Sequence, residues 1–167
     1  MHKVVLRGAC LSDCGHFRYH LSRRFQVVEP MRSLCFVMLN PSTADADLDD
    51  PTIRKCLGFA QRGDYDGIDV VNLYAYRATK PADLKAAHYP VGPKNDTWIT
   101  ATALATFAGG GDVVCAWGQN ASGLSRAAEV VSLLRSLDVP LFTLDRCKDG
   151  TPAHPLMLPY SRTLQAF

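Results

Sequence analysis

The sequence lacks the features that define several large protein classes. No apolar run approaches the roughly 18 residues that cross a membrane, and the first 30 residues hold no apolar stretch followed by a small-residue cleavage site. We therefore expect a cytoplasmic protein with no membrane partner. Neither GxGxxG nor GxxxxGK[ST] occurs, so the glycine-rich loops that bind dinucleotides and triphosphates are missing and we expect no cofactor.

The chain also lacks a strong net charge. Eighteen Lys and Arg stand against sixteen Asp and Glu, a balance of +2, which is too small for the whole molecule to attract DNA or an anionic membrane. The charge is unevenly spread, because the charged side chains within residues 1–32 are mostly Lys and Arg, while residues 45–69 contain seven Asp. A basic arm thus precedes an acidic loop, and any nucleic-acid affinity has to be local.

The chain has no linker and no repeat. Its 167 residues are 47% apolar, which predicts one domain, 1–167, with a core large enough to be stable without disulfides. In the cytoplasm its six cysteines are expected to be reduced. We expect no metal, although Cys10, Cys14, His16 and His20 form a compressed C-x3-C-x-H-x3-H pattern that leaves zinc as an alternative.

Short apolar runs alternate with segments of helical spacing. The predicted strands are 33–39, 68–73, 113–117 and 140–144, and the predicted helices are 52–60, 96–107 and 124–137. Residues 16–28 alternate loosely, as in an outlying strand or hairpin. Strands that alternate with helices predict an α/β three-layer sandwich, with a short central parallel sheet of about four strands plus an N-terminal strand or hairpin.

Polar side chains follow each predicted strand. Amides, hydroxyls, aromatic rings and one histidine make up this set, which includes Asn40, Ser42, Thr43, Asn72, Tyr74, Trp117, His154 and Ser161. In open parallel sheets, ligands bind outside the carboxyl ends of the strands. Side-chain amides offer both a donor and an acceptor, and rings offer a stacking surface. The pattern therefore favours a planar, hydrogen-bonding ligand such as a nucleobase.

The blocks MLNPSTADADLDDPTIRKCLGFA, VVNLYAYRATKPADL, VVCAWG and HPLMLPYS resemble an uncharacterised bacterial and phage family, domain of unknown function 1643, over nearly the whole chain. More distantly, their order is similar to the uracil-DNA glycosylase superfamily. That resemblance implies a uracil-DNA-glycosylase-like fold and a site that surrounds a flipped base.

The more distant resemblance assigns roles to individual residues. Asn40 falls where that superfamily positions the attacking water, and His154 where it donates a hydrogen bond to the leaving base. On the loop that follows, Asp45, Asp49 or Asp50 could act as a base. Asn72, Tyr74 and Trp117 would read or stack the base, and Ser42, Thr43, Ser161 and Arg162 would contact phosphates. Because Tyr76 stands where the iron-sulfur branches have a cysteine, no cluster is expected.

The expected function is therefore recognition of a nucleobase or nucleotide, with DNA-glycosylase-like hydrolysis of an unusual or modified base. Two alternatives remain. The protein could be a transferase or other processing enzyme for modified nucleotides, in which Asn40 positions a nucleophile other than water. It could also be a noncatalytic module that binds nucleic acid or nucleotides. Both alternatives keep the same partner class, and the sequence does not fix the oligomeric state.

Overall fold

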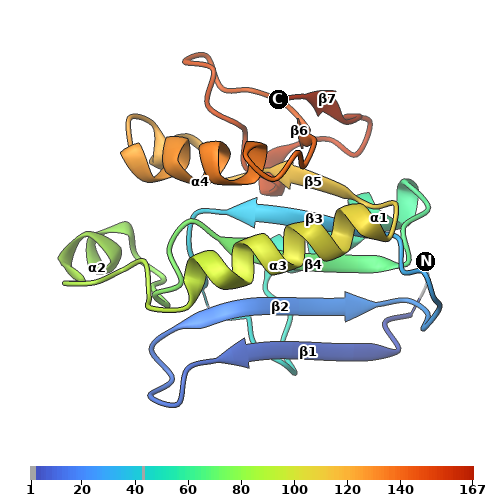
Figure 1. Ribbon diagram of the computed structural model, residues 1–167, viewed down its shortest axis with the longest axis horizontal. Helices are drawn as coiled ribbons and strands as arrows, with labels where there is room; N and C mark the ends of the chain where they lie inside the picture. Colours follow the sequence, from blue (N-terminus) through green and yellow to red (C-terminus); the bar gives the residue numbers. More distant parts are fainter. Residues whose placement is uncertain (1–2, 43) are drawn as a thin grey trace.

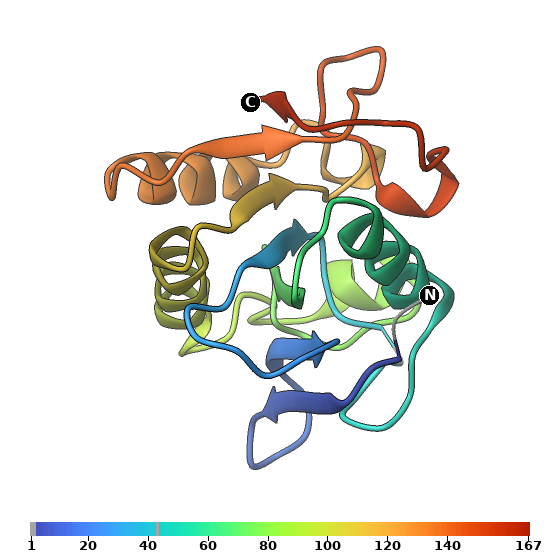
Figure 2. The same ribbon diagram turned by 90° about the vertical axis from the view of Figure 1, so that its right-hand side faces the viewer.

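The computed structural model describes residues 3–42 and 44–167, which form a single seven-stranded sheet with helices on both faces (Figures 1 and 2). The strands are β1 Leu6–Leu11, β2 Arg18–Arg24, β3 Ser33–Met38, β4 Gly67–Asn72, β5 Asp112–Cys115, β6 Leu141–Thr143 and β7 Gln165–Ala166. Their order across the sheet is β1-β2-β4-β3-β5-β6-β7.

The centre of the sheet is parallel, as the alternating pattern predicted. Strand β3 pairs in parallel with both β4 and β5, and β5 pairs in parallel with β6. Every residue of β3 and of β4 is buried, which explains why both segments are mainly apolar without regular alternation, with Asp69 and Asn72 as the buried polar exceptions in β4. The predicted strands are confirmed within about two residues at each end.

Helices cover the two faces of the sheet and build two cores (Figure 2). Helix α1, Pro51–Arg62, packs Ile53 and Leu57 on one face, against Phe36 and Val70. On the other face lie α3, Asn95–Ala108, and α4, Ser125–Arg135, which bury Ile99, Ala103, Val130 and Leu134. All three predicted helices are confirmed, and the arrangement is layered α/β.

Three elements were not predicted. Strand β1 forms a hairpin with β2. The prediction covered β2 within residues 16–28, which is two residues longer at the start and four residues longer at the end than the strand. Helix α2, Pro81–Ala86, and the exposed two-residue strand β7 were also missed. These segments are short or largely exposed, so they carry little of the hydrophobic periodicity on which sequence interpretation depends. The parallel centre has the four expected strands, β4, β3, β5 and β6, and the N-terminal hairpin and β7 extend the sheet to seven.

The basic arm and the acidic loop pair with each other. Arg23 on β2 is fully buried and its Nε donates to Asp49 Oδ1 at 2.8 Å, while its Nη2 donates to the carbonyl oxygens of Asp45 and Leu48. Arg7 on β1 binds the other Asp49 oxygen at 2.9 Å. Part of the uneven charge is therefore compensated inside the molecule, where it fixes the loop before α1.

No helix in the described part of the chain has the length and apolar character that crossing a bilayer requires.

Candidate active site

A cleft of about 290 Å³ opens at the carboxyl ends of the parallel strands. After β3 the chain continues to β4 on one side, and it then returns past β3 to form β5 on the other side. This reversal is the topological switch point at which open α/β sheets bind ligands. The switch-point cleft, as we call it, is lined by Arg18, Met38, Leu39, Asn40, Ser42, Asp50, Thr52, Ile53, Asn72, Ala78, Thr79, Trp117, Gly118, Gln119, Asn120 and His154.

Six of the predicted site residues meet in this cleft. They come from the ends of β3, β4 and β5, from the residue before α1 and from the segment before the 3-10 helix at Pro155–Met157: Asn40, Ser42, Asp50, Asn72, Trp117 and His154. The cleft thus unites residues that lie more than one hundred positions apart in the chain. Their proximity is a property of the fold, and their chemical roles remain predictions.

Asn72 ends β4 with a side chain that the fold does not satisfy. The residue is 1% exposed, and its Nδ2 has no hydrogen-bond partner among the described residues. A buried donor without an acceptor costs about 1–3 kcal/mol. The backbone at this point is instead well held, because Asn95 Nδ2 donates to the carbonyl oxygens of Asn72 and Leu73 at 2.9 and 3.0 Å. The amide of Asn72 is therefore a firmly positioned group with unused hydrogen-bonding capacity.

Asn40 uses its amide nitrogen to shape the loop. Nδ2 donates to the carbonyl oxygens of Pro41 at 2.9 Å and Ala78 at 2.7 Å, which ties the end of β3 to the segment that follows β4. Both donor hydrogens are occupied, so the group that Asn40 can offer to a ligand or a water molecule is its acceptor, Oδ1.

His154 presents a neutral imidazole with a defined tautomer. Its Nδ1 accepts a hydrogen bond from the Leu156 backbone N–H at 3.3 Å, which places the proton of the neutral ring on Nε2. Burial lowers the pKa of His154, and the charge of Asp50 opposes this effect. The side chain is thus a donor at neutral pH. Gly118, with φ of +78°, packs directly on it, since a Cβ there would lie 2.9 Å from the His154 Cβ.

Asp50 has a structural role beside any chemical one. It is the N-cap of α1, and its Oδ1 accepts from the Ile53 N–H at 2.9 Å. Its charge acts on two cleft residues, because it raises the pKa of both His154 and Arg18 against the effect of burial. The three side chains line the same cleft.

Arg18 is the charged residue of the cleft that sequence interpretation missed, and the hydroxyl residues Thr52 and Thr79 were missed as well. It opens β2 and is only 3% exposed, and its Nη1 donates to the Ala44 carbonyl oxygen. Its Nε has no partner among the described residues. In the sequence Arg18 was one of several cations of the basic arm, and nothing local distinguishes it from Arg23 or Arg24, since only the antiparallel pairing of β2 brings it to this edge of the sheet.

Three predicted site residues lie elsewhere. Tyr74 packs, partly buried, against the core under α3 and α4, because the chain turns to that face once β4 has ended at Asn72. Arg162 forms an ion pair with Asp145 at 3.0 Å, and neither it nor the exposed Ser161 lines the cleft. The structure does not bring them to the site. Thr43 falls outside the described residues.

Trp117 contributes an edge of the cleft and is otherwise part of the core. It is 4% exposed and meets Phe167 edge to face at a centroid distance of 5.8 Å. Because most of the indole is covered, it can form one wall for a ligand but offers little open ring face for stacking.

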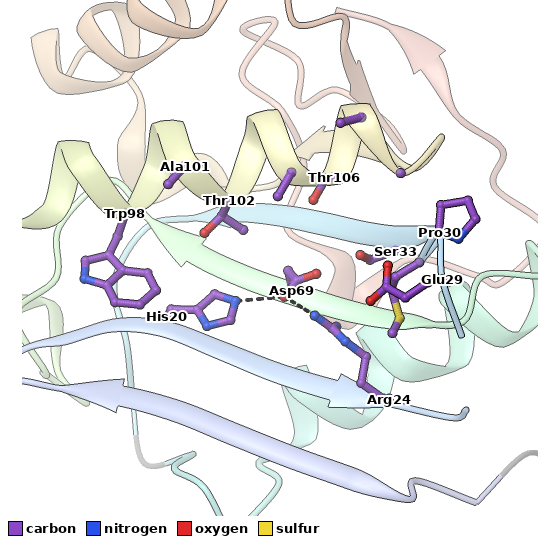
Figure 3. A pocket seen from close by; sticks show the side chains of 14 residues that line it. His20, Arg24, Glu29, Pro30, Ser33, Asp69, Trp98, Ala101, Thr102 and Thr106 are labelled. Carbon is purple, nitrogen blue, oxygen red and sulfur yellow. Dashed lines mark hydrogen bonds and ion pairs between the residues drawn. The ribbon is translucent and has the colours of Figure 1, made fainter. Parts of the chain in front are cut away.

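A second and larger hollow lies on the face of the sheet that α3 covers, between α3 and β2 (Figure 3). We call it the α3 groove; its volume is about 560 Å³. At its floor Asp69 accepts from His20 Nε2 and Arg24 Nη2, each at 2.8 Å, and the His20 ring stacks on Trp98. Burial raises the pKa of Asp69, but these two partners outweigh it and lower the pKa to about 2.

The α3 groove and the switch-point cleft differ in how far their buried polar groups have hydrogen-bond partners within the protein. In the α3 groove the buried carboxylate has two partners, and much of the wall is alanine from α3. In the switch-point cleft a buried guanidinium and a buried amide each keep a nitrogen without a partner, whereas in the α3 groove the one such atom among the described residues is the Thr106 hydroxyl oxygen. Unmet polar groups in a concave site indicate a ligand, so the switch-point cleft is the stronger candidate despite its smaller volume.

No group of three or more His, Cys, Asp or Glu side chains within residues 3–42 and 44–167 is arranged to hold a metal ion. His20, a member of the alternative zinc pattern, is bonded to Asp69. Within the same ranges Cys10 and Cys14 are free thiols.

A family model described as protein of unknown function (DUF1643) matches residues 18–156. The match spans most of the chain and includes all six predicted residues of the cleft as well as Arg18. No curated protein and no solved structure matches the chain.

Proposed function

The chain belongs to the family of proteins of unknown function DUF1643, and we propose that it recognises a nucleobase or nucleotide in the switch-point cleft and hydrolyses the N-glycosidic bond of that ligand. The observation that carries the proposal is the convergence of Asn40, Asn72 and His154 on one polar cleft at the switch point of the sheet.

The groups in the cleft complement the edge of a base. Asn72 offers an unused amide, and His154 offers an Nε2–H donor. A base presents both carbonyl acceptors and ring or amino donors, so a pair of such groups can read one edge of it. The cleft volume of about 290 Å³ lies at the lower end of the range of roughly 300–1,000 Å³ for small-molecule sites, as expected for a single flat ligand.

The same cleft holds the parts needed for hydrolysis. Asn40 Oδ1 accepts a hydrogen bond from a water molecule, and the Asp50 carboxylate takes the proton as the water oxygen bonds to the sugar carbon. The bond from that carbon to the base nitrogen breaks, and the electron pair leaves with the base. His154 Nε2–H then stabilises the charge that develops on a base oxygen, an effect typically worth about 10²–10³ in rate.

Resemblance to the uracil-DNA glycosylase superfamily supports this proposal and extends it to the fold. The order of the blocks, with a first motif at Asn40, an asparagine-bearing strand and a late His154-Pro155 motif, is similar to that superfamily. The layered sheet and the position of the cleft are compatible with such a fold. The nature of the base is left open.

The experiment is a release assay. The protein is incubated with nucleosides, nucleoside monophosphates and oligonucleotides that contain uracil, hypoxanthine, mismatched or hypermodified bases, and the liberated base is measured by chromatography. We expect release with at least one substrate, a loss of about 10²-fold in kcat for His154→Leu, and partial recovery for His154→Gln, which keeps an N–H donor.

An exposed histidine outside the cleft provides the control. His88→Leu should leave the rate unchanged. Binding without release in the wild-type protein would remove hydrolysis and favour the noncatalytic module. Release that requires a second nucleophilic substrate would favour the transferase. If no base, nucleoside or nucleotide binds, the whole proposal fails.

A further inference from the structure

Arg18 carries a buried charge that the fold does not neutralise. No carboxylate among the described residues lies within 4.0 Å of it, the distance of an ion pair, although six other arginines have such a partner. Isolated burial of a charge is expensive, so buried cations are normally paired. The pKa of Arg18 reflects this: it is lowered to about 10, mainly by burial, although the charge of Asp50 acts to raise it.

Its neighbours do not remove the imbalance. Arg77 and Arg23 act on Arg18 with like charge, and Asp50 and Asp45 act with opposite charge. Neither carboxylate forms an ion pair with the guanidinium, which keeps a positive charge at a cleft that it helps to line.

The orientation of the guanidinium is fixed on one side. Nη1 is held by the Ala44 carbonyl oxygen, whereas Nε has no partner among the described residues. The Nε edge of an arginine grips two oxygens of a phosphate or carboxylate through parallel N–H donors. One such donor is unused here, in a side chain already ordered by its contact with the loop.

The rest of the cleft wall restricts how many anionic groups can bind. Among the described residues that line it, Arg18 is the single Lys or Arg. Proteins that hold a nucleic-acid strand neutralise several successive phosphates with several cations. One buried cation suits one phosphate. The hydroxyl groups of Ser42 and Thr52 on the same wall can accompany it.

We propose that the ligand of the switch-point cleft is a free nucleoside monophosphate whose single phosphate is bound by Arg18, and not a nucleic-acid strand. This inference rests on the proposed recognition of a nucleobase, which it deepens by naming the substrate class. The phosphate supplies the missing counter-charge, and the base supplies partners for Asn72 and His154.

Calorimetric titration tests the inference on the wild-type protein. The four common ribonucleoside monophosphates, their nucleosides, inorganic phosphate and a single-stranded 12-mer of mixed sequence are compared at two salt concentrations. We expect at least one monophosphate to bind roughly ten-fold or more tightly than its nucleoside. The 12-mer should bind no more tightly than that monophosphate, with a salt dependence no steeper than one phosphate contact gives.

Variants then assign the effect to Arg18. Arg18→Met should equalise the affinities for the monophosphate and its nucleoside, Arg18→Lys should retain part of the preference, and Arg7→Met, outside the cleft, should change neither. If Arg18→Met does not fold, the wild-type comparison alone still decides. Equal affinities for nucleoside and monophosphate in the wild-type protein, or tighter binding of the 12-mer with a steep salt dependence, would overturn the inference.

The outcomes separate this inference from the proposed function. Nucleosides that bind as well as their monophosphates would preserve base recognition and remove the phosphate contact. Inorganic phosphate that binds in an Arg18-dependent manner, with no contribution from any base, would preserve the anion site and remove nucleobase recognition.

Discussion

At the residue scale, the cleft is built from side chains whose hydrogen-bonding capacity is only partly used by the protein. Asn40 and Asn72 show the two possibilities. Asn40 spends both donor hydrogens on the loop, while the amide nitrogen of Asn72 is buried with no partner among the described residues. Such groups impair folding slightly and are expected where a ligand completes them.

Asn72→Leu should therefore separate stability from binding. Since the amide is unpaired, an apolar side chain of similar volume is expected to leave the free energy of unfolding within about 1 kcal/mol or to raise it, whereas ligand affinity falls below detection. Urea unfolding and calorimetry measure the two effects. Asn95→Leu is the contrast, because it removes two hydrogen bonds to carbonyl oxygens and should destabilise by about 1–3 kcal/mol. A large loss of stability in Asn72→Leu would show that its amide has a structural partner.

Gly118→Ala should displace His154. Gly118 and Gly123 both have positive φ, +78° and +72°, so alanine strains the backbone at either position by about 1 kcal/mol. Only at Gly118 does the new Cβ meet His154, at 2.9 Å, while at Gly123 nothing lies within 4 Å. Base release should drop at least ten-fold in Gly118→Ala and stay unchanged in Gly123→Ala. Equal rates in the two variants would remove the positioning role of Gly118.

The residues of the cleft were predictable to different degrees. Asn40 and Asn72 follow or close apolar runs, and that position suggested a site at the strand ends, whereas the role expected for His154 came mostly from the resemblance to the glycosylase superfamily. Arg18 gave no such signal, because a cation at the start of an antiparallel edge hairpin looks like any solvated arginine until the pairing of β2 with β4 is known. Tyr74 was expected in the cleft but lies outside it for a related reason. It stands two residues beyond the end of β4, where the chain has turned to the face covered by α3 and α4.

At the element scale, α1 joins the fold to the site through its first residues. Asp50 caps the helix and lines the cleft at once. The segment was recognisable from its Asp-Pro start and from the spacing of Ile53, Cys56 and Leu57, which is why its limits were predicted closely. Helix α2 and β7 lack such spacing and were missed.

Substitutions at Asp50 should distinguish its two roles. Asn is as good an N-cap as Asp, so Asp50→Asn should keep the stability of the protein, whereas Asp50→Ala should lose about 1 kcal/mol. Both variants remove the carboxylate, and both should reduce base release to the same extent if it accepts the proton of the water. Thermal unfolding and the release assay give the two readouts. Full activity in Asp50→Asn would restrict Asp50 to capping.

At the scale of the whole molecule, two buried ionic clusters hold the hairpin β1–β2 on the parallel sheet. One joins Arg23 to the acidic loop on the α1 side, and the other joins His20 and Arg24 to Asp69 on the α3 side. Both connect segments more than twenty residues apart. Neither set of partners could be identified from the sequence, because it contains many arginines and aspartates and each could pair with several others.

Arg23 and Arg7 bind the same carboxylate and should differ sharply in their contribution. Arg23→Met removes a fully buried cation with four further carbonyl partners and leaves Asp49 poorly compensated, so a loss of about 3–5 kcal/mol is expected. Arg7 is 37% exposed, and Arg7→Met should cost less than about 1 kcal/mol. Urea unfolding measures both values, and similar losses in the two variants would contradict this assignment.

Asp69 should make stability depend on acid pH. Its folded pKa of about 2 lies below the unfolded value of about 3.9, so its contribution of about 2 kcal/mol is complete above about pH 5 and is lost as the pH falls towards 2. Unfolding followed from pH 6 to pH 2 should show this decline in the wild-type protein. In Asp69→Asn stability should be lower at pH 6 and flatter with pH, and an unchanged slope would refute the contribution.

Strand β2 has a consequence for how ligand choice can diversify. The parallel strands furnish the asparagines and the tryptophan edge, but the guanidinium arrives on a hairpin that is antiparallel to them and packs from outside. The guanidinium and the asparagines therefore lie on different strands of one sheet, although β2 is paired with β4 and buries Leu21 and Arg23. Under the proposed roles, an exchange confined to the start of β2, with Leu21 and Arg23 left in place, is the natural route to redirect selectivity from nucleoside monophosphates to uncharged nucleosides.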